Sequence, residues 1–225
     1  MAKYQIIRDV GLNLLGVVRA ELQAQRAKAK AFLATPTAEF LRKNTPSLVL
    51  YLYEMRTHMA ARRGEEWHIE EEIVDEKGEM HVVRYNRPLE LTLNYILVAS
   101  ADDLAEEHEL LAIGMSAFLD KPRLERNDLQ GDSFFRGDDL HVKNDFEFDM
   151  GRAQAILGPL GAGTKVAAAY STQARLFTGK ELGRSRRVRE RHIDVFDPLR
   201  PPPGSIAAKE LGLEAKPPKI VATKK

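Results

Sequence analysis

The segment Pro88 to Ala99, with the sequence PLELTLNYILVA, constrains the fold more than any other part of the chain. Its first half alternates between apolar and polar residues, which is typical of a β-strand with one buried face. The apolar residues on that face are Leu89, Leu91, Leu93 and Tyr95. The run Ile96 to Val98 is apolar on both faces, and such strands lie in the middle of a sheet that is covered on two sides. We therefore predict a central strand here.

Two long helices are predicted from the spacing of apolar residues. The first covers residues 4–30, with an apolar face that repeats every three or four residues: Ile7, Val10, Leu14, Val18 and Leu22. The second runs from about Leu104 to Leu119, after a segment, residues 100–103, that can cap a helix, and it ends before Pro122. Its predicted buried face consists of Leu104, His108, Leu111, Met115, Phe118 and Leu119.

The remaining predicted elements are mainly strands. β-Compatible residues predict strands at 48–56, 142–148 and 164–177, although the Ala triplet at 167–169 would equally suit a helix, and a short helix is predicted at 150–157. The segments 67–74 and 80–85 flank an acidic turn, residues 75–78, which suits a hairpin with a type I turn. This hairpin is highly charged, so we expect it at a surface or a subunit boundary. Together the elements predict an α+β fold, with a mixed, mostly antiparallel sheet flanked by two main helices and a charged β-hairpin.

The charge of the chain changes near residue 180. Residues 180–225 contain 12 Lys and Arg against six Asp and Glu, whereas the rest of the chain contains 22 against 27. The same segment contains two Pro-rich runs, so we do not expect it to pack as a core. We therefore predict an α/β domain at residues 1–180 and a basic, Pro-containing extended C-terminal arm at residues 181–225. Such a charge asymmetry indicates an arm that interacts with a partner.

The absence of cysteine excludes several classes of protein. A chain of 225 residues without Cys is not a disulfide scaffold, and it has no Cys-ligated metal site and no catalytic thiol. No apolar run approaches the roughly 18 residues of a membrane-spanning helix, and the first residues lack the pattern of a secretory signal. We expect a soluble protein that is made and kept inside the cell, unless it is exported or released by lysis.

Two segments come close to known ligand-binding motifs. Residues 158–165, GPLGAGTK, differ from a phosphate-binding loop because Thr164 precedes Lys165 and because Pro159 lacks a main-chain N–H group. Residues 108–112, HELLA, begin like a zinc-protease helix, but Ala112 stands where the second His ligand is required. We interpret the first segment as a Gly-rich connection and the second as part of an ordinary helix.

No group of residues in the sequence argues for catalysis. The six His residues show no ligand spacing, and neighbouring carboxylates such as Asp102 and Asp103 do not face each other on a helix. Ser133 lacks the flanking glycines of a nucleophile elbow. We therefore predict no catalytic residue, no cofactor and no metal site, in a protein that is not an enzyme. An enzyme of unrecognised type stays open only because a cleft is not visible in a sequence.

The strongest charge feature lies in the C-terminal arm, which carries five closely spaced Arg residues: Arg184, Arg186, Arg187, Arg189 and Arg191. Guanidinium groups bind carboxylates and phosphates in a bidentate manner, so we predict a partner-binding segment here. No aromatic residues are interleaved with the Arg residues, and the rest of the chain is acidic, which favours an acidic protein surface over nucleic acid. The alternatives are a nucleic-acid-binding protein that uses this segment and a tail that only keeps the protein soluble.

Three segments of the chain, taken in order, resemble those of one family. They are YQIIRDVGLNLLGVVRAEL, PSLVLYLYEMRTH and RPLELTLNYILVASADDLAEEHELLAIGMSAFLDKPRL. The third is the most specific, because a P-L-x-L-x-L-x-Y-x-L strand leads through an acidic segment into an E-x-x-L-L-x-x-x-M helix at residues 107–115. Over roughly residues 4–177, this order resembles the tail-terminator, or cap, proteins of phage-tail-like contractile injection systems.

The resemblance implies a phage tail-terminator-like fold and a structural protein that works without chemistry. Six copies would form a homohexameric ring on the last layer of the inner tube and the contractile sheath, and the ring would stop polymerisation. The implied partners are other copies of the chain and the sheath and inner-tube proteins, with no small-molecule substrate. Assembly would take place in the cytoplasm, as part of a particle that is then either released or tethered. The segment Arg184 to Arg191 is the candidate arm toward an acidic sheath surface.

Overall fold

The computed structural model describes residues 4–57, 68–74, 78, 80–135 and 137–186 of the chain. The helices are α1 (Ile6–Ala24), α2 (Ala38–Lys43), α3 (Leu104–Asp120), α4 (Met150–Leu157) and the 3₁₀ helix η2 (Gly158–Leu160). The strands are β1 (Lys30–Leu33), β2 (Ser47–Thr57), β3 (His68–Val74), β4 (Met80–Asn86), β5 (Leu89–Ser100), β6 (Arg123–Leu124), β7 (Leu140–His141), β8 (Lys143–Asn144), β9 (Ala167–Leu176) and β10 (Glu181–Arg186).

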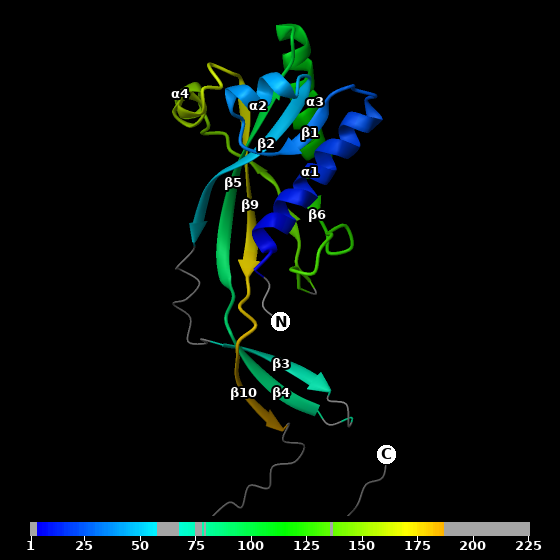
Figure 1. The fold of residues 1–225 in the computed structure, drawn as a ribbon. Coiled ribbons are helices and arrows are strands. Elements are labelled where there is room, and N and C mark those ends of the chain that lie inside the picture. The colour runs from blue at the N-terminus through cyan, green and yellow to red at the C-terminus, as the bar shows by residue number, and fades with distance from the viewer. Residues whose placement is uncertain (1–3, 58–67, 75–77, 79, 136, 187–225) are drawn as a thin grey trace, which may run out of the picture. The chain divides into compact units, whose positions relative to one another are not determined.

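The main sheet has five strands in the order β1-β2-β5-β9-β8. β1 runs parallel to β2, and all other neighbours are antiparallel. The longest strands, β2, β5 and β9, lie side by side in the middle, whereas β1 and β8 each pair along only a short part of them (Figure 1). The predicted α+β class with a mostly antiparallel sheet is confirmed.

The predicted central strand β5 lies between β2 and β9 and is buried on both faces. One face of the sheet packs against α1 and α3, to which β5 contributes alternate side chains: Leu91, Leu93, Tyr95, Leu97 and Ala99. The other face packs against α2 and α4 through Ile96 and Val98, which meet Leu41 and Leu157. The two long helices therefore cover the same face, and two short helices cover the opposite one (Figure 1).

Helix α1 is shorter than the sequence predicts. It ends at Ala24, not at residue 30, and Lys30 already belongs to β1. After Leu22 the predicted apolar face contains no large side chain that packing could hold against the sheet, and Arg26 adopts a positive φ of 56° that turns the chain away from the helix axis. The predicted inner face is confirmed for its main part, since Val10, Leu14, Val18 and Leu22 are buried.

Helix α3 has the predicted bounds, but the prediction of its buried face is wrong. Of the six residues expected inside, Leu111 and Phe118 are buried, whereas Leu104 is 65%, Met115 is 40% and Leu119 is 79% exposed. His108 is exposed as well. The buried residues are instead Glu107, Leu110, Leu111, Gly114, Ala117 and Phe118.

Small residues explain which side of α3 faces the sheet. A Cβ atom added at Gly114 would lie 2.7 Å from Leu97 Cδ2 and 3.1 Å from Leu48 Cδ1. The helix therefore approaches the strands as closely as only glycine permits. Asp103 caps the helix, because its carboxylate accepts a hydrogen bond from the N–H group of Glu106 at 3.4 Å.

The predicted charged hairpin is present as β3 and β4, which pair in register from His68 and Asn86 to Val74 and Met80. Trp67 and most residues of the predicted type I turn lie outside the described residues. β10 pairs with the other edge of β4 and completes a second, three-stranded sheet in the order β10-β4-β3. β4 leads directly into β5, and β9 leads into β10, so the same two stretches of chain run through both sheets.

Three further differences concern short elements. β1 and α2 were not predicted, since four and six residues are too short for a periodic pattern. The strand predicted at 142–148 contracts to β8, and the N–H group of Asp145 bonds to Ala169 O as the chain turns away. The expected strand at 164–177 and helix at 150–157 are confirmed as β9 and α4.

Candidate interaction surfaces

A polar clamp fixes the loop between β6 and β7 against α1. The side chain of Asn13 donates to Gln130 O and accepts from Gln130 N, each at 2.8 Å. The buried carboxylate of Asp9 accepts a hydrogen bond of 2.6 Å from Ser133 Oγ. Gly131, with φ of +105°, lies so close that a Cβ atom there would come within 2.6 Å of Asp9 Oδ2. The clamp thereby positions the described residues that follow, 134, 135 and 137–143, beside the sheet.

These residues border a groove along the outer edge of β9. β8 pairs with β9 only at Tyr170 and Ser171. In the part of the chain that the structure describes, no strand pairs with the outer edge of β9 from Thr172 to Leu176. A groove of about 510 Å³ lies there, lined by the five consecutive residues 171–175. Since consecutive residues of a strand point to opposite faces, the groove runs along the strand edge itself.

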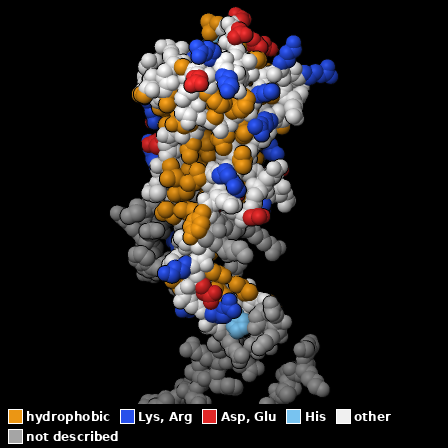
Figure 2. All heavy atoms as spheres, in the orientation of Figure 1, with side chains coloured by type: hydrophobic (Ala, Val, Ile, Leu, Met, Phe, Trp, Pro, Cys, Tyr) orange, Lys and Arg blue, Asp and Glu red, His pale blue; other side chains and the backbone are white. Residues whose placement is uncertain are grey.

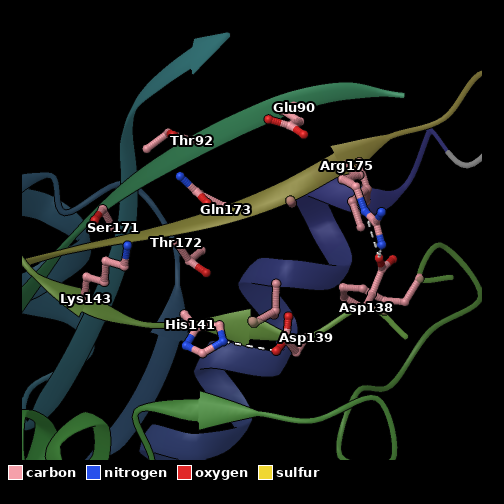
Figure 3. A pocket seen from close by; sticks show the side chains of 14 residues that line it. Glu90, Thr92, Asp138, Asp139, His141, Lys143, Ser171, Thr172, Gln173 and Arg175 are labelled. Carbon is pink, nitrogen blue, oxygen red and sulfur yellow. Dashed lines mark hydrogen bonds and ion pairs between the residues drawn. The ribbon is translucent and has the colours of Figure 1, made fainter. Parts of the chain in front are cut away.

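Charged side chains from both sides line this groove (Figure 3). Arg175 of β9 forms an ion pair with the buried Asp138, which also accepts a 2.6 Å hydrogen bond from the N–H group of Phe135. Glu90 of β5 and Lys143 of β8 line the groove as well. The groove is therefore polar and of mixed charge, and the ion pair ties β9 to the loop at one end.

Asp139 is the centre of a second charged cluster. Its carboxylate oxygen Oδ2 lies 3.0 Å from His141 Nε2 and 2.8 Å from Arg123 Nη2. Burial tends to raise the pKa of Asp139, but the hydrogen bonds and charges of His141 and Arg123 outweigh it and lower the pKa below the usual value. The carboxylate is thus held ionised by two basic partners, which is an arrangement for holding strand β7 rather than for moving a proton.

Thr172 is the one polar side chain of the groove that is buried without a partner. It is 2% exposed, and its hydroxyl oxygen makes no hydrogen bond with any residue that the structure describes. Figure 3 shows its side chain pointing from β9 toward the space between the strand and the loop. A buried hydroxyl without a partner is costly, so this position favours a polar group supplied from outside the chain.

The predicted Arg residues are only partly placed by the structure. Arg184 and Arg186 lie in β10 and pair with Val83 and His81 of β4 in the three-stranded sheet. The Nε atom of Arg184 lies 3.2 Å from Glu181 Oε1 on the surface. Arg187, Arg189 and Arg191 lie outside the described residues. β10 shows that regular pairing continues past residue 180, and the division of the chain at that residue stays a prediction.

The two near-motifs have structural roles. In the Gly-rich segment, Lys165 forms an ion pair with Glu107 of α3, and both side chains are largely buried. The ammonium group is therefore committed to a carboxylate, and residues 158–160 form the 3₁₀ helix η2 instead of an open loop. His108 lies on the exposed side of α3 with Ala112 one turn away. No three His, Asp or Glu side chains among the described residues are grouped so that they could hold a metal ion.

A family match covers most of these elements. Residues 9–158, more than half of the chain, match the model of the Pvc16 N-terminal domain. The chain belongs to the Pvc16 N-terminal domain family. The matched part of this Pvc16 N-terminal domain extends from α1 to the end of α4, and β9 and β10 follow it in the chain. No protein of curated function matches the sequence.

Two solved structures share the fold of this Pvc16 N-terminal domain protein. The first is the sheath/tube terminator of PVC, an extracellular contractile injection system, in its extended state, with a TM-score of 0.59, 13% identity and 86% of this chain covered. The second is the tube-terminating cap of the anti-feeding prophage, with a TM-score of 0.54, 11% identity and 80% covered. The chain spans less than two thirds of either protein, 64% and 59%. The predicted resemblance to tail terminators is confirmed.

The groove beside β9 was not predicted from the sequence. The only relevant pattern is length: the strand predicted at 164–177 is longer than the one predicted at 142–148, so a pairing of the two leaves part of the longer strand without a partner.

Figure 2 shows a second surface feature, a band of hydrophobic side chains over β2 and β5. It agrees with the partial burial of Leu52 and Leu89 and the 49% exposure of Met55. No described helix of this Pvc16 family member is long and apolar enough to cross a membrane.

Proposed function

We propose that this protein is the tail terminator, or cap, of a contractile injection system. In this proposal six copies form a ring that ends the inner tube and the sheath and stops their polymerisation. The single observation that carries it is the shared fold: the chain belongs to the Pvc16 N-terminal domain family and matches two terminator structures. The particle is assembled in the cytoplasm and is then released or tethered.

The physical role of such a protein follows from the geometry of its partners. A tube built from head-to-tail contacts has an open end that keeps adding subunits, because each new layer exposes the same surface again. A terminator presents one surface that fits the last layer and another that does not fit the next subunit. It acts by shape, so we propose that the protein is not an enzyme.

The groove along β9 is the surface that we assign to a sheath or tube partner. An extended segment of another protein can add to a free strand edge through main-chain hydrogen bonds, with side-chain pockets that give specificity. The edge from Thr172 to Leu176 and the unpartnered hydroxyl of Thr172 favour such an arrangement. The Arg-rich segment, residues 184–191, is proposed as a second contact, with an acidic surface of the sheath as its partner.

Imaging of particles made with and without this chain tests the proposal. We expect particles that lack the chain to have tubes of variable length and no density at the end opposite the baseplate. Restoring the full chain should bring back one length and a cap of six copies at that end. Particles of normal length and unchanged ends in the absence of the chain would show that the proposed function is wrong.

A further inference from the structure

The outer side of α3 carries an apolar stripe that nothing in the described chain covers. Leu104 is 65%, Met115 is 40% and Leu119 is 79% exposed. Ala112 is exposed between them, these residues recur at helical spacing along more than three turns, and the exposed His108 lies within the stripe between Leu104 and Ala112. We name Leu104, Ala112, Met115 and Leu119 the α3 stripe. The stripe lies next to the buried face of the same helix, so the apolar surface of α3 extends beyond the face that packs inside the subunit.

A helix whose apolar surface is wider than the face it buries normally has a further contact that covers the rest. Isolated exposed apolar residues are common on protein surfaces, but several large ones along one side of a helix mark a surface that another molecule covers. The stripe thus explains why the sequence pattern predicts burial of Leu104, Met115 and Leu119. Their burial is expected in an assembly of subunits, and the single subunit leaves them exposed.

Acidic side chains are grouped around the first turns of α3, where the stripe begins, and Glu109 flanks the stripe itself. Asp102, Asp103, Glu106 and Glu109 are all exposed. Among the described residues, no Lys, Arg or His forms an ion pair with any of the four. Figure 2 shows this acidic group at the end of the molecule where α3 begins, at the top of the view. A molecule that covers the α3 stripe therefore requires an apolar surface next to positive charge.

The same chain carries a surface with these two properties. A hollow of about 320 Å³ lies where the end of α1 leads into β1, and its apolar lining includes Leu22, Ala27, Ala31 and Phe32. Arg19 and Lys30 form its rim, and Lys28 is exposed beside it. Arg19 donates only to a main-chain oxygen, Ala31 O at 3.1 Å, so its positive charge is not neutralised by that contact. We name these residues the basic hollow.

We propose that the α3 stripe of one copy docks in the basic hollow of a second copy. The inference rests on the proposed function, because it names the contact that would close the ring. In the proposed pair the stripe of one copy contacts the hollow of the other only once, so the contact is head-to-tail and leaves one free stripe and one free hollow, whereas two reciprocal contacts would close a dimer instead of a ring. Contacts of this type continue from copy to copy until a ring closes. Opposite charge fixes the orientation, and the apolar stripe supplies the area removed from water.

Charge reversal tests the pairing of the two surfaces. The mass of the full chain is measured by sedimentation velocity, and the wild type is expected to form a closed oligomer. Asp102→Lys with Glu109→Lys should leave monomers, and Lys28→Glu with Lys30→Glu should do the same. One chain that carries all four substitutions should form the closed oligomer again, because its stripe and hollow are once more complementary. Failure of that rescue, with folded monomers by circular dichroism, overturns the proposal.

Apolar substitutions provide a second measurement. Leu104→Ser with Leu119→Ser should lower the oligomer fraction at least tenfold at equal protein concentration. The matched control is Phe146→Ser, since Phe146 is 91% exposed but lies outside both surfaces. Equal oligomer fractions in the stripe variant and the wild type would contradict the inference, and so would loss of the oligomer in the control alone.

Particle imaging separates failure of this contact from failure of the proposed function. If the wild-type chain caps particles but the stripe variant still forms rings, the contact is wrong and the cap role stands. A stripe variant that forms rings but no longer caps particles would assign the stripe to sheath or tube, which also overturns the inference. If the wild-type chain is monomeric in solution at every concentration, the contact proposed here is wrong, and the appearance of particle ends decides the cap role separately.

Discussion

Buried polar side chains of this protein differ in whether they have a partner. Asn13, 7% exposed, satisfies both main-chain groups of Gln130, and Asp9, 3% exposed, is bound by Ser133. The hydroxyl of Tyr95, 1% exposed, has no hydrogen-bond partner among the described residues. The first two residues hold a loop in place, whereas Tyr95 contributes packing to the core and a hydroxyl that opposes burial.

Substitution of Asn13 tests the clamp on the loop between β6 and β7. Asn13→Ala leaves the N–H and C=O groups of Gln130 without partners in a half-buried place, so the free energy of unfolding should fall by about 1–3 kcal/mol. Urea unfolding followed by circular dichroism measures the loss. Gln25→Ala is the control, because the exposed side chain of Gln25 makes one surface hydrogen bond, to Glu21, and its loss should change stability by less than about 0.5 kcal/mol.

The buried tyrosines make the fold sensitive to alkali. Burial raises the pKa of Tyr170 to about 12 and raises that of Tyr95 still further. A tyrosine in the unfolded chain loses its proton near pH 10. The unfolded state therefore binds fewer protons than the folded state between about pH 10 and 12, and stability falls as the pH rises through this range.

The corresponding experiment is thermal unfolding between pH 8 and 11.5. The melting temperature should fall above about pH 10, and the fall should be smaller in Tyr170→Phe. The exposed Tyr4, 71% accessible, serves as the control, since Tyr4→Phe should leave the pH profile unchanged. A wild-type profile that stays flat to pH 11.5 would contradict the assignment of Tyr170 and Tyr95.

At the scale of elements, two glycines in two helices are expected to respond in opposite directions. Gly114→Ala places a Cβ atom 2.7 Å from Leu97 Cδ2, and Leu97 is itself fully buried. We therefore expect the free energy of unfolding to fall by about 1–3 kcal/mol. Gly16 of α1 has no atom within 4 Å of that position, and Gly16→Ala should add about 0.5–1 kcal/mol through helix propensity. Urea unfolding of both variants measures the difference, and equal effects would contradict the close approach of α3 to the sheet.

Elements with long, regular patterns were predictable from the sequence. For helix α3, the sequence did not show which part of its wide apolar surface packs against the sheet. Alternation identifies β2, β5 and β9, because packing on the sheet and the sequence pattern agree there. In α3 the apolar residues cover a wide part of the helix surface. The small size of Gly114 and Ala117 decides which part of that surface meets the sheet. The groove beside β9 depends on where β8 ends, which is a property of tertiary pairing that no local pattern contains.

At the scale of the whole molecule, β10 determines where the C-terminal arm is best cut. A chain that ends at Arg186 keeps β10 paired with β4 and removes Arg187, Arg189 and Arg191. We expect this chain to form the same closed oligomer as the wild type but to cap particles at least tenfold less often, because its contact with the acidic sheath surface is lost.

Sedimentation velocity and counts of capped ends in electron micrographs measure the two effects. Replacement of Arg187, Arg189 and Arg191 by Gln in the full chain is the matched control for loss of length, and it should reduce capping in the same direction. Normal capping by the shortened chain would show that the proposed contact between the Arg-rich segment and the sheath is wrong.

The passage of β9 into β10 has a mechanical consequence. Tension applied along the strand direction at the end of β10 enters β9 lengthwise. It is resisted in shear by the ten residue pairs between β5 and β9, from Leu89 with Leu176 to Val98 with Ala167. Main-chain hydrogen bonds between two strands that are pulled along their length carry the force together. When two strands are pulled apart from one end, the same hydrogen bonds break one after another. Whatever grips the chain beyond Arg186 therefore pulls first on the pairing of β10 with β4 and then on the ten-pair ladder between β5 and β9.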